Sequence, residues 1–235
     1  MKRLLILLLL GCIVMVLASC SEPVHQQPKF VIAIFDEPSS MNEQALEQGK
    51  VFIDSRIVPL LEGGDKFGII SISGNSFTCP DTGQLFTLVS SPITCDREMD
   101  SINSITLNQI HRLISEVRIR PEFTASDILG ALARASTFFV EDTLSEKILI
   151  IISDMEENVW RPGITDLIKL NGVRVYALFI SHKFKNIKDD VQAYTAKKQY
   201  WENLLHSTGT ANSFLWDDDI SRLKMDWLVE QLEQN

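Results

Sequence analysis

The chain has 235 residues, of which 45% are hydrophobic, and its formal net charge is −9. This length and composition suit one sizeable α/β domain with an ordinary packed core. An acidic chain without a run of Lys and Arg lacks the positive patch that nucleic-acid binding requires, so we exclude nucleic acid as a partner.

The N-terminus carries a targeting signal. Lys2 and Arg3 precede an apolar stretch over residues 4–17, and the small residues of LASC follow at positions 17–20. A short basic start, an apolar stretch and small residues before a cleavage point are typical of a secretory signal. The stretch is shorter than the roughly 20 apolar residues of a comfortable membrane span. We therefore predict a signal peptide over residues 1–19, and the alternative is an uncleaved signal anchor that remains as a single membrane helix.

The LASC motif resembles the lipobox of bacterial lipoproteins. The resemblance implies cleavage before Cys20 and attachment of diacylglycerol and a fatty acyl chain such as palmitate to this residue. Several acyl chains on one cysteine hold a protein stably on a membrane. Ser21, in place of Asp after the cysteine, favours the periplasmic face of the outer membrane in a host that has one. We expect a lipid-anchored protein of the bacterial cell envelope, with residues 20–28 as the lipidated cysteine and tether.

Two further cysteines, Cys79 and Cys95, lie in a segment without clear periodicity, residues 74–105. If Cys20 is lipidated, they are the only pair left in the mature chain, since Cys12 belongs to the signal peptide. Export to an oxidising compartment favours a disulfide between them, worth about 3 kcal/mol in the chain-entropy model. The alternative is two reduced, inert thiols.

From residue 29 onward, apolar strands alternate with amphipathic helices. We expect strands at residues 29–35, 66–73, 86–89, 147–153, 173–180 and 211–216. We expect helices at residues 42–61, 106–117, 125–140, 164–170, 187–205 and 220–232. This alternation predicts βαβ units around a mostly parallel sheet in a single domain over residues 29–235, with 86–89 as a short edge strand. In such folds, ligands bind at the carboxyl ends of the strands.

Oxygen-bearing side chains follow two of these strands. Asp36 ends the first strand and Asp154 follows the most apolar one, so both carboxylates come to the same edge of the sheet. Ser126 lies where a helix is expected to begin, and Ser40 lies on the turn after Asp36. Taken singly, each residue is explained as well by a turn or a helix cap. Taken together, they favour a site for a hard cation such as Mg²⁺ or Ca²⁺, which prefers oxygen ligands.

Three segments in this order resemble the motifs of the von Willebrand factor A (vWA) domain. DEPSSM at 36–41 is similar to the family's Asp-x-Ser-x-Ser motif, SDILGAL at 126–132 to a segment that usually opens with Thr, and SDM at 153–155 to an Asp motif after the fourth strand. The resemblance implies a Rossmann-like vWA fold, with a mostly parallel central sheet, one short antiparallel edge strand and helices on both faces. It also implies a metal-ion-dependent adhesion site. The residues that it assigns to Mg²⁺ or another divalent cation are Asp36, Ser40, Ser126 and Asp154.

The chain departs from the family pattern at three positions. Pro38 replaces the first serine, Ser126 stands for the usual threonine, and Met155 stands for the common glycine. The proline removes one hydroxyl ligand, which water can replace because Mg²⁺ keeps several waters. We expect a partly degenerate site that binds the cation more weakly than an intact one.

The vWA resemblance implies recognition and not catalysis, because the family's cation usually completes its coordination with a carboxylate from a partner protein. We expect a membrane-anchored binding module for a protein partner, with Glu37 and Trp160 as candidate partner contacts, although Trp160 could equally pack against its own domain. One alternative is a metal-dependent hydrolase that uses Asp36, Asp154 and Glu37. Another is a degenerate vWA domain that binds its partner without metal. The sequence contains neither G-x-S-x-G nor a P-loop motif.

Overall fold

The structure is a computed structural model that describes residues 27–78, 83–90, 96–179, 187–215 and 226–230. Cys20, Cys79 and Cys95 lie outside these ranges, so the signal peptide, the lipid anchor and the disulfide stay predictions. Within the described ranges, no helix combines the length and the apolar character that a membrane crossing needs.

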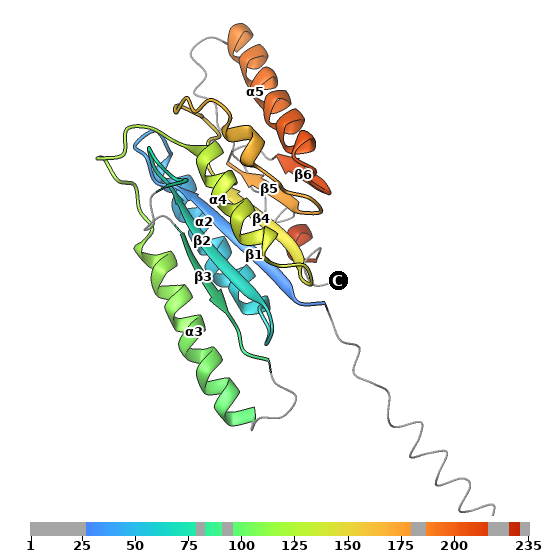
Figure 1. The fold of residues 1–235 in the computed structure, drawn as a ribbon. Coiled ribbons are helices and arrows are strands. Elements are labelled where there is room, and N and C mark those ends of the chain that lie inside the picture. The colour runs from blue at the N-terminus through green and yellow to red at the C-terminus, as the bar shows by residue number, and fades with distance from the viewer. Residues whose placement is uncertain (1–26, 79–82, 91–95, 180–186, 216–225, 231–235) are drawn as a thin grey trace, which may run out of the picture.

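A six-stranded sheet in the order β3-β2-β1-β4-β5-β6 forms the centre of the molecule (Figure 1). The strands are β1 (Lys29–Asp36), β2 (Lys66–Ile72), β3 (Gly83–Thr87), β4 (Glu146–Ile152), β5 (Arg174–Leu178) and β6 (Asn212–Leu215). β3 pairs with β2 in the antiparallel direction, and the other neighbouring strands of the sheet pair in parallel. The predicted sheet, mostly parallel with one short antiparallel edge strand, is confirmed.

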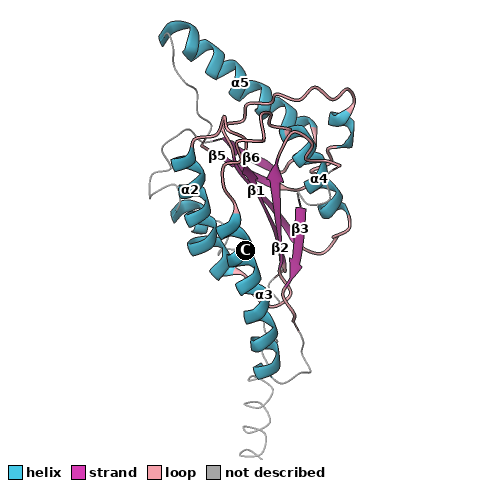
Figure 2. Cartoon of the chain, turned by 90° about the vertical axis from the view of Figure 1, so that its left-hand side faces the viewer, coloured by secondary structure: helices cyan, strands magenta, loops and turns pink. Residues whose placement is uncertain are grey.

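Helices cover both faces of this sheet (Figure 2). Along β1, Val31 and Phe35 lie in one hydrophobic core, and Ile32 and Ile34 lie in the other. Side chains of a strand alternate between the two faces, so a strand buried on both sides is apolar at every position. The first core receives α2 (Glu43–Phe52), α3 (Asp96–Glu116) and residues 226–230, and the second receives α4 (Ile128–Val140), the 3₁₀ helix Ile164–Leu167 and α5 (Ile187–Ser207).

The helix expected over residues 42–61 is confirmed, with a change of helix type along its length. Asn42 caps α2, because its side-chain oxygen accepts hydrogen bonds from the backbone N–H groups of Gln44 and Ala45. The chain then continues as a π-helix over Ile53–Ile57 and a 3₁₀ turn over Val58–Leu60.

Several boundaries differ from the sequence-based expectation, chiefly those of α3 and β3. α3 begins at Asp96, so residues 96–105, in the segment without clear periodicity, are helical. Ile102 and Ile105 in this first part of the helix are 42% and 57% exposed, and without a buried face the helical period is weak in the sequence. β3 spans Gly83–Thr87 in place of residues 86–89. Of the last predicted helix, only residues 226–230 are described, and they are helical.

Candidate functional site

The candidate site lies at the carboxyl edge of the sheet, between β1 and β4. These neighbouring strands run parallel, with Phe35 opposite Ile152, so Asp36 at the end of one strand and Ser153 and Asp154 after the other arrive together. The chain leaves β1 for β2 on one side and later returns to β4 on the other side. Such a reversal of strand order opens the crevice in which parallel α/β sheets bind ligands.

Asp36 is the buried centre of this site. It has no exposed surface, and its two carboxylate oxygens accept hydrogen bonds from Ser126 Oγ (3.2 Å) and Ser153 Oγ (2.6 Å). Burial raises the pKa of Asp36 to about 7, and the nearby charge of Asp154 adds to the rise, while the two hydroxyls oppose it. A cation beside two carboxylates would remove much of this penalty.

The Ser126 hydroxyl takes part in the site and not in capping α4, because the next residue, Asp127, is the helix cap. Asp127, not Ser126, is the N-cap of α4, and its carboxylate accepts a hydrogen bond from Gly130 N at 3.0 Å. Ser126 is fully buried and its hydroxyl is directed to Asp36. The cap explanation for Ser126 is therefore wrong, and the first and second motifs are in contact.

Ser40 offers an unused hydroxyl. Its Oγ is buried and has no hydrogen-bond partner among the described residues, whereas neighbouring Ser39 is exposed. The turn that carries it is closed by a hydrogen bond from Met41 N to the Pro38 carbonyl oxygen at 3.1 Å. A buried hydroxyl without a partner is costly, and a bound cation is one way to satisfy it.

The loop after β4 holds Asp154 through contacts that the sequence alone does not reveal. Met155 has a φ of 58°, which explains why glycine is usual at this position in the family that the motifs resemble. Trp201 Nε1 on α5 donates a hydrogen bond to the Met155 carbonyl oxygen at 2.9 Å, and Lys197 Nζ donates one to the Asp154 carbonyl oxygen at 3.0 Å. α5 therefore fixes the backbone on which Asp154, itself only 6% exposed, stands.

Glu37 lies away from the candidate cation site. Named from the sequence as a candidate partner contact, it is buried, with 1% of its surface exposed. Successive strand residues point to opposite faces, and the Glu37 carboxylate accepts a hydrogen bond from Ser71 Oγ (3.1 Å) and forms an ion pair with Arg120 Nε (2.7 Å). It does not join Asp36 and Asp154 around a metal, as the hydrolase alternative requires. Trp160, the other candidate partner contact, is 87% exposed after the Asp154 loop.

The donor set fits a hard cation. Asp36 and Asp154 supply carboxylate oxygens and Ser40 and Ser126 supply hydroxyl oxygens, the ligand types that Mg²⁺ prefers. No cluster of three or more His, Cys, Asp and Glu that could hold a metal occurs in the described part of the chain.

Comparison with known proteins finds no matching family model and no matching curated protein. Among solved structures, the chain is similar to a von Willebrand factor type A protein from Catenulispora acidiphila, at 9% identity and a TM-score of 0.49 over 88% of this chain and 42% of that one. An aerotolerance-related membrane protein from Bacteroides fragilis aligns at 17% identity and a TM-score of 0.46, over 88% of this chain and 100% of that one. Proximal thread matrix protein 1 from the mussel byssus, in a form with a zinc-occupied MIDAS motif, aligns at 16% identity and a TM-score of 0.48, over 88% of this chain and 47% of that one.

This chain therefore spans less than half the length of two of these neighbours. The strand order and pairing of the chain itself define its α/β architecture.

Proposed function

We propose that this chain is a vWA-like binding module that recognises a protein partner through a divalent cation. The observation that carries the proposal is the meeting of Asp36 and Ser126 at the strand-order reversal, 90 residues apart in sequence. Asp36, Ser40, Ser126 and Asp154 would hold Mg²⁺, and the cation would offer an open position to a carboxylate of the partner. Trp160, exposed near this edge, is suited to an interface, where Trp is enriched among the residues that dominate binding.

The location that we propose for this module is the outer surface of a membrane. The LASC motif at positions 17–20 supports a lipid anchor on Cys20, and the polar residues that follow supply a tether. The wild type should incorporate labelled palmitate, and Cys20→Ser should not. A wild type that takes up no label and keeps residues 1–19 would favour an uncleaved signal anchor.

The deciding experiment is crosslinking and affinity purification from membranes, with and without a chelator. We expect a partner protein to be captured by the wild type in Mg²⁺, and to be lost in chelator and with Asp154→Ala. Asp166→Asn is a suitable control, because Asp166 is exposed and lies outside the three motifs.

A second candidate is a degenerate module that binds its partner without metal. Two observations favour it: Pro38 removes one ligand, and Asp36 already has hydrogen bonds from Ser126 and Ser153. With a pKa of about 7, Asp36 can also hold a proton in place of a cation. Partner capture that is unchanged by chelator and by Asp154→Ala would select this candidate.

A further inference from the structure

The chain enters the domain at the amino edge of the sheet, the edge opposite the candidate cation site. The Pro28 carbonyl oxygen accepts a hydrogen bond from Glu146 N at 2.8 Å, and the first residue of β1 donates its backbone N–H to Asp65 Oδ1 at 2.7 Å. Just before them, Gln27 Nε2 donates to the Leu144 carbonyl oxygen at 2.8 Å. These bonds fix the point at which the tether leaves the domain, beside the α4–β4 turn (residues 140–145).

The tether that joins this point to the proposed anchor is short. Gln27 follows Cys20 by seven residues, which span at most about 25 Å when fully extended. β1 alone carries the chain about 26 Å from the amino edge to the carboxyl edge, and the loops after the strands reach further. With the carboxyl edge on the bilayer, the tether would have to cover the length of β1 and of these loops. It is too short to do so, and the carboxyl edge is therefore held away from the membrane that binds Cys20.

The α4–β4 turn exposes two large aliphatic side chains. Leu144 is 77% exposed and Val140 is 61% exposed, and among the large hydrophobic residues that the structure describes only Trp160, at 87%, exceeds them. A single exposed aliphatic side chain is ordinary on a protein surface. These two lie four positions apart at the place where the tether leaves the domain, whereas Trp160 follows β4 at the edge that the tether holds away from the membrane.

A weak contact with lipid is enough to orient the domain. Leu144 and Val140 alone would not hold a chain of net charge −9 on an anionic membrane, which repels it. A short tether, however, keeps the turn beside the bilayer at an effective concentration in the millimolar range. Glu141, exposed in the same turn, can pair with the ammonium group of a phosphatidylethanolamine headgroup. The anchor therefore supplies the affinity, and the two aliphatic side chains need only favour one orientation over the others.

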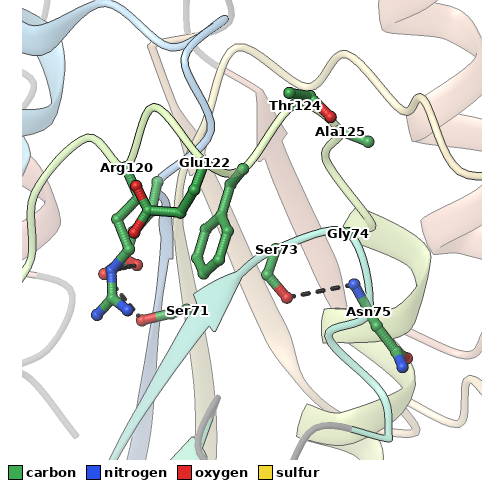
Figure 3. A pocket seen from close by; sticks show the side chains of 10 residues that line it. Ser71, Ser73, Gly74, Asn75, Arg120, Glu122, Thr124 and Ala125 are labelled. Carbon is green, nitrogen blue, oxygen red and sulfur yellow. Dashed lines mark hydrogen bonds and ion pairs between the residues drawn. The ribbon is translucent and has the colours of Figure 1, made fainter.

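The carboxyl edge has the features that suit a protein partner. Beside the candidate cation site lies a pocket of about 510 Å³, in which Arg120 and Glu122 face Ser71 and Ser73 at the end of β2 (Figure 3). The pocket and the candidate cation site lie at the same edge of the sheet, so one partner can cover both.

We infer that the α4–β4 turn rests on the lipid surface that holds Cys20, with Leu144 and Val140 among the headgroups. The cation site at the carboxyl edge then faces away from this membrane. The inference rests on the proposed function in that Cys20 carries the lipid anchor. It adds that the partner must present its acidic residue from the aqueous side, above the level of the lipid headgroups.

The test compares two strongly exposed positions at opposite edges of the sheet. The lipidated protein, with benzoylphenylalanine at position 144 or 160, is placed on vesicles of phosphatidylethanolamine and phosphatidylglycerol and irradiated. We expect about 5-fold more lipid adduct from position 144 than from position 160, measured by mass spectrometry, because the tether keeps only the first near the bilayer. Equal yields, a larger yield at position 160, or a crosslink from position 144 to a second copy of the chain would overturn the inference.

Vesicle flotation separates this result from the lipid anchor itself. A wild type that does not float with the vesicles refutes the anchor, and the inference with it. A wild type that floats, but gives equal lipid adducts at both positions, refutes the orientation alone and leaves the anchor in place.

A variant tests the contribution of Leu144. Benzoylphenylalanine at position 140 should also form lipid adducts, and Leu144→Glu should lower their yield about 5-fold, because a second carboxylate in the turn is repelled by anionic lipid. Leu167→Glu is the matched control, since Leu167 is 50% exposed and lies outside the turn, and it should leave the yield unchanged. The same yield in Leu144→Glu as in the control would contradict a lipid contact at this turn.

Discussion

Asp36 shows how a candidate binding site lowers the stability of the domain that carries it. The residue is fully buried and its pKa is raised to about 7, mainly by burial. Between pH 4 and pH 7 the folded protein holds a proton on Asp36 that the unfolded chain has lost. By proton linkage, the contribution of this residue to the free energy of unfolding is greatest below pH 4, falls as the pH rises to 7, and stays low above it.

We therefore expect Asp36→Asn to stabilise the metal-free protein at pH 8 and to change it little at pH 4. A rise of one pKa unit corresponds to about 1.4 kcal/mol, and with relaxation around the site we expect a gain of ~1–3 kcal/mol. Urea unfolding in EDTA at both pH values measures this difference, with Asp166→Asn as the exposed control. The same gain at pH 4 and pH 8 would contradict the raised pKa as the cause.

Pro38 is the residue at which the candidate site departs from the vWA motif that the sequence resembles. Its carbonyl oxygen closes the turn by accepting from Met41 N, a contact that serine can keep. We expect Pro38→Ser to bind Mg²⁺ about 5- to 10-fold more tightly, equivalent to ~1–1.4 kcal/mol, because a hydroxyl replaces a water ligand. Isothermal titration calorimetry measures the change. Ser39→Ala, which alters an exposed neighbour, should leave the Mg²⁺ affinity unchanged. If Ser39→Ala changes the affinity as much as Pro38→Ser does, the gain comes from the backbone of the turn and not from a new hydroxyl ligand.

At the scale of elements, the start of α4 joins several loops of the carboxyl edge. Asp127 caps the helix, accepts a hydrogen bond from Ser76 N at 2.8 Å and forms an ion pair with Arg161 at 3.2 Å. Glu157 of the Asp154 loop accepts a hydrogen bond from Leu129 N at 2.8 Å. The first turn of α4 therefore ties the loops after β2 and β4 to the helix that presents Ser126.

Gly130 is required for this arrangement. A Cβ at this position would lie 2.2 Å from Asp127 Oδ2 and 2.5 Å from Asp127 Cγ. Alanine normally favours a helix over glycine by about 1 kcal/mol, but here Asp127 would have to leave its buried place. We expect Gly130→Ala to destabilise the domain by ~2–3 kcal/mol in urea unfolding. Gly74→Ala is the matched control, since its Cβ meets nothing within 4 Å, and an equal or smaller loss in Gly130→Ala would contradict the clash.

Local sequence patterns predict the strands that are covered on both faces of the sheet. β1 and β4 are apolar at nearly every position because both faces of the sheet are covered, and the sequence therefore identifies them and the residues that follow. The beginning of α3 escapes prediction because Ile102 and Ile105 are exposed there and no buried stripe forms. Asp127 and Ser126 are adjacent potential caps, and only the three-dimensional contacts decide which one caps the helix.

At the scale of the whole molecule, the candidate site depends on partners that are far apart in the chain. The motifs predict that Asp36, Ser126 and Asp154 come together, because parallel strands deliver their ends to one edge. They do not predict Ser153 as the closest donor to Asp36, since its hydroxyl could face either side of the turn. Nor do they predict Lys197 and Trp201, which reach the Asp154 loop from α5 across more than 40 residues. Such long-range contacts leave no pattern in the neighbouring sequence.

Cation binding should raise the thermal stability of the whole domain. A ligand that binds only the folded state adds RT ln(1 + [L]/Kd) to the free energy of unfolding, ~1.4 kcal/mol at ten times Kd. For a domain of this size, that gain raises Tm by about 3–6 °C. We expect the rise for the wild type in Mg²⁺ and its absence for Asp154→Ala, measured by differential scanning fluorimetry. Equal rises in both proteins would place the cation elsewhere on the acidic surface, and no rise in the wild type at saturating Mg²⁺ would contradict a cation at Asp36.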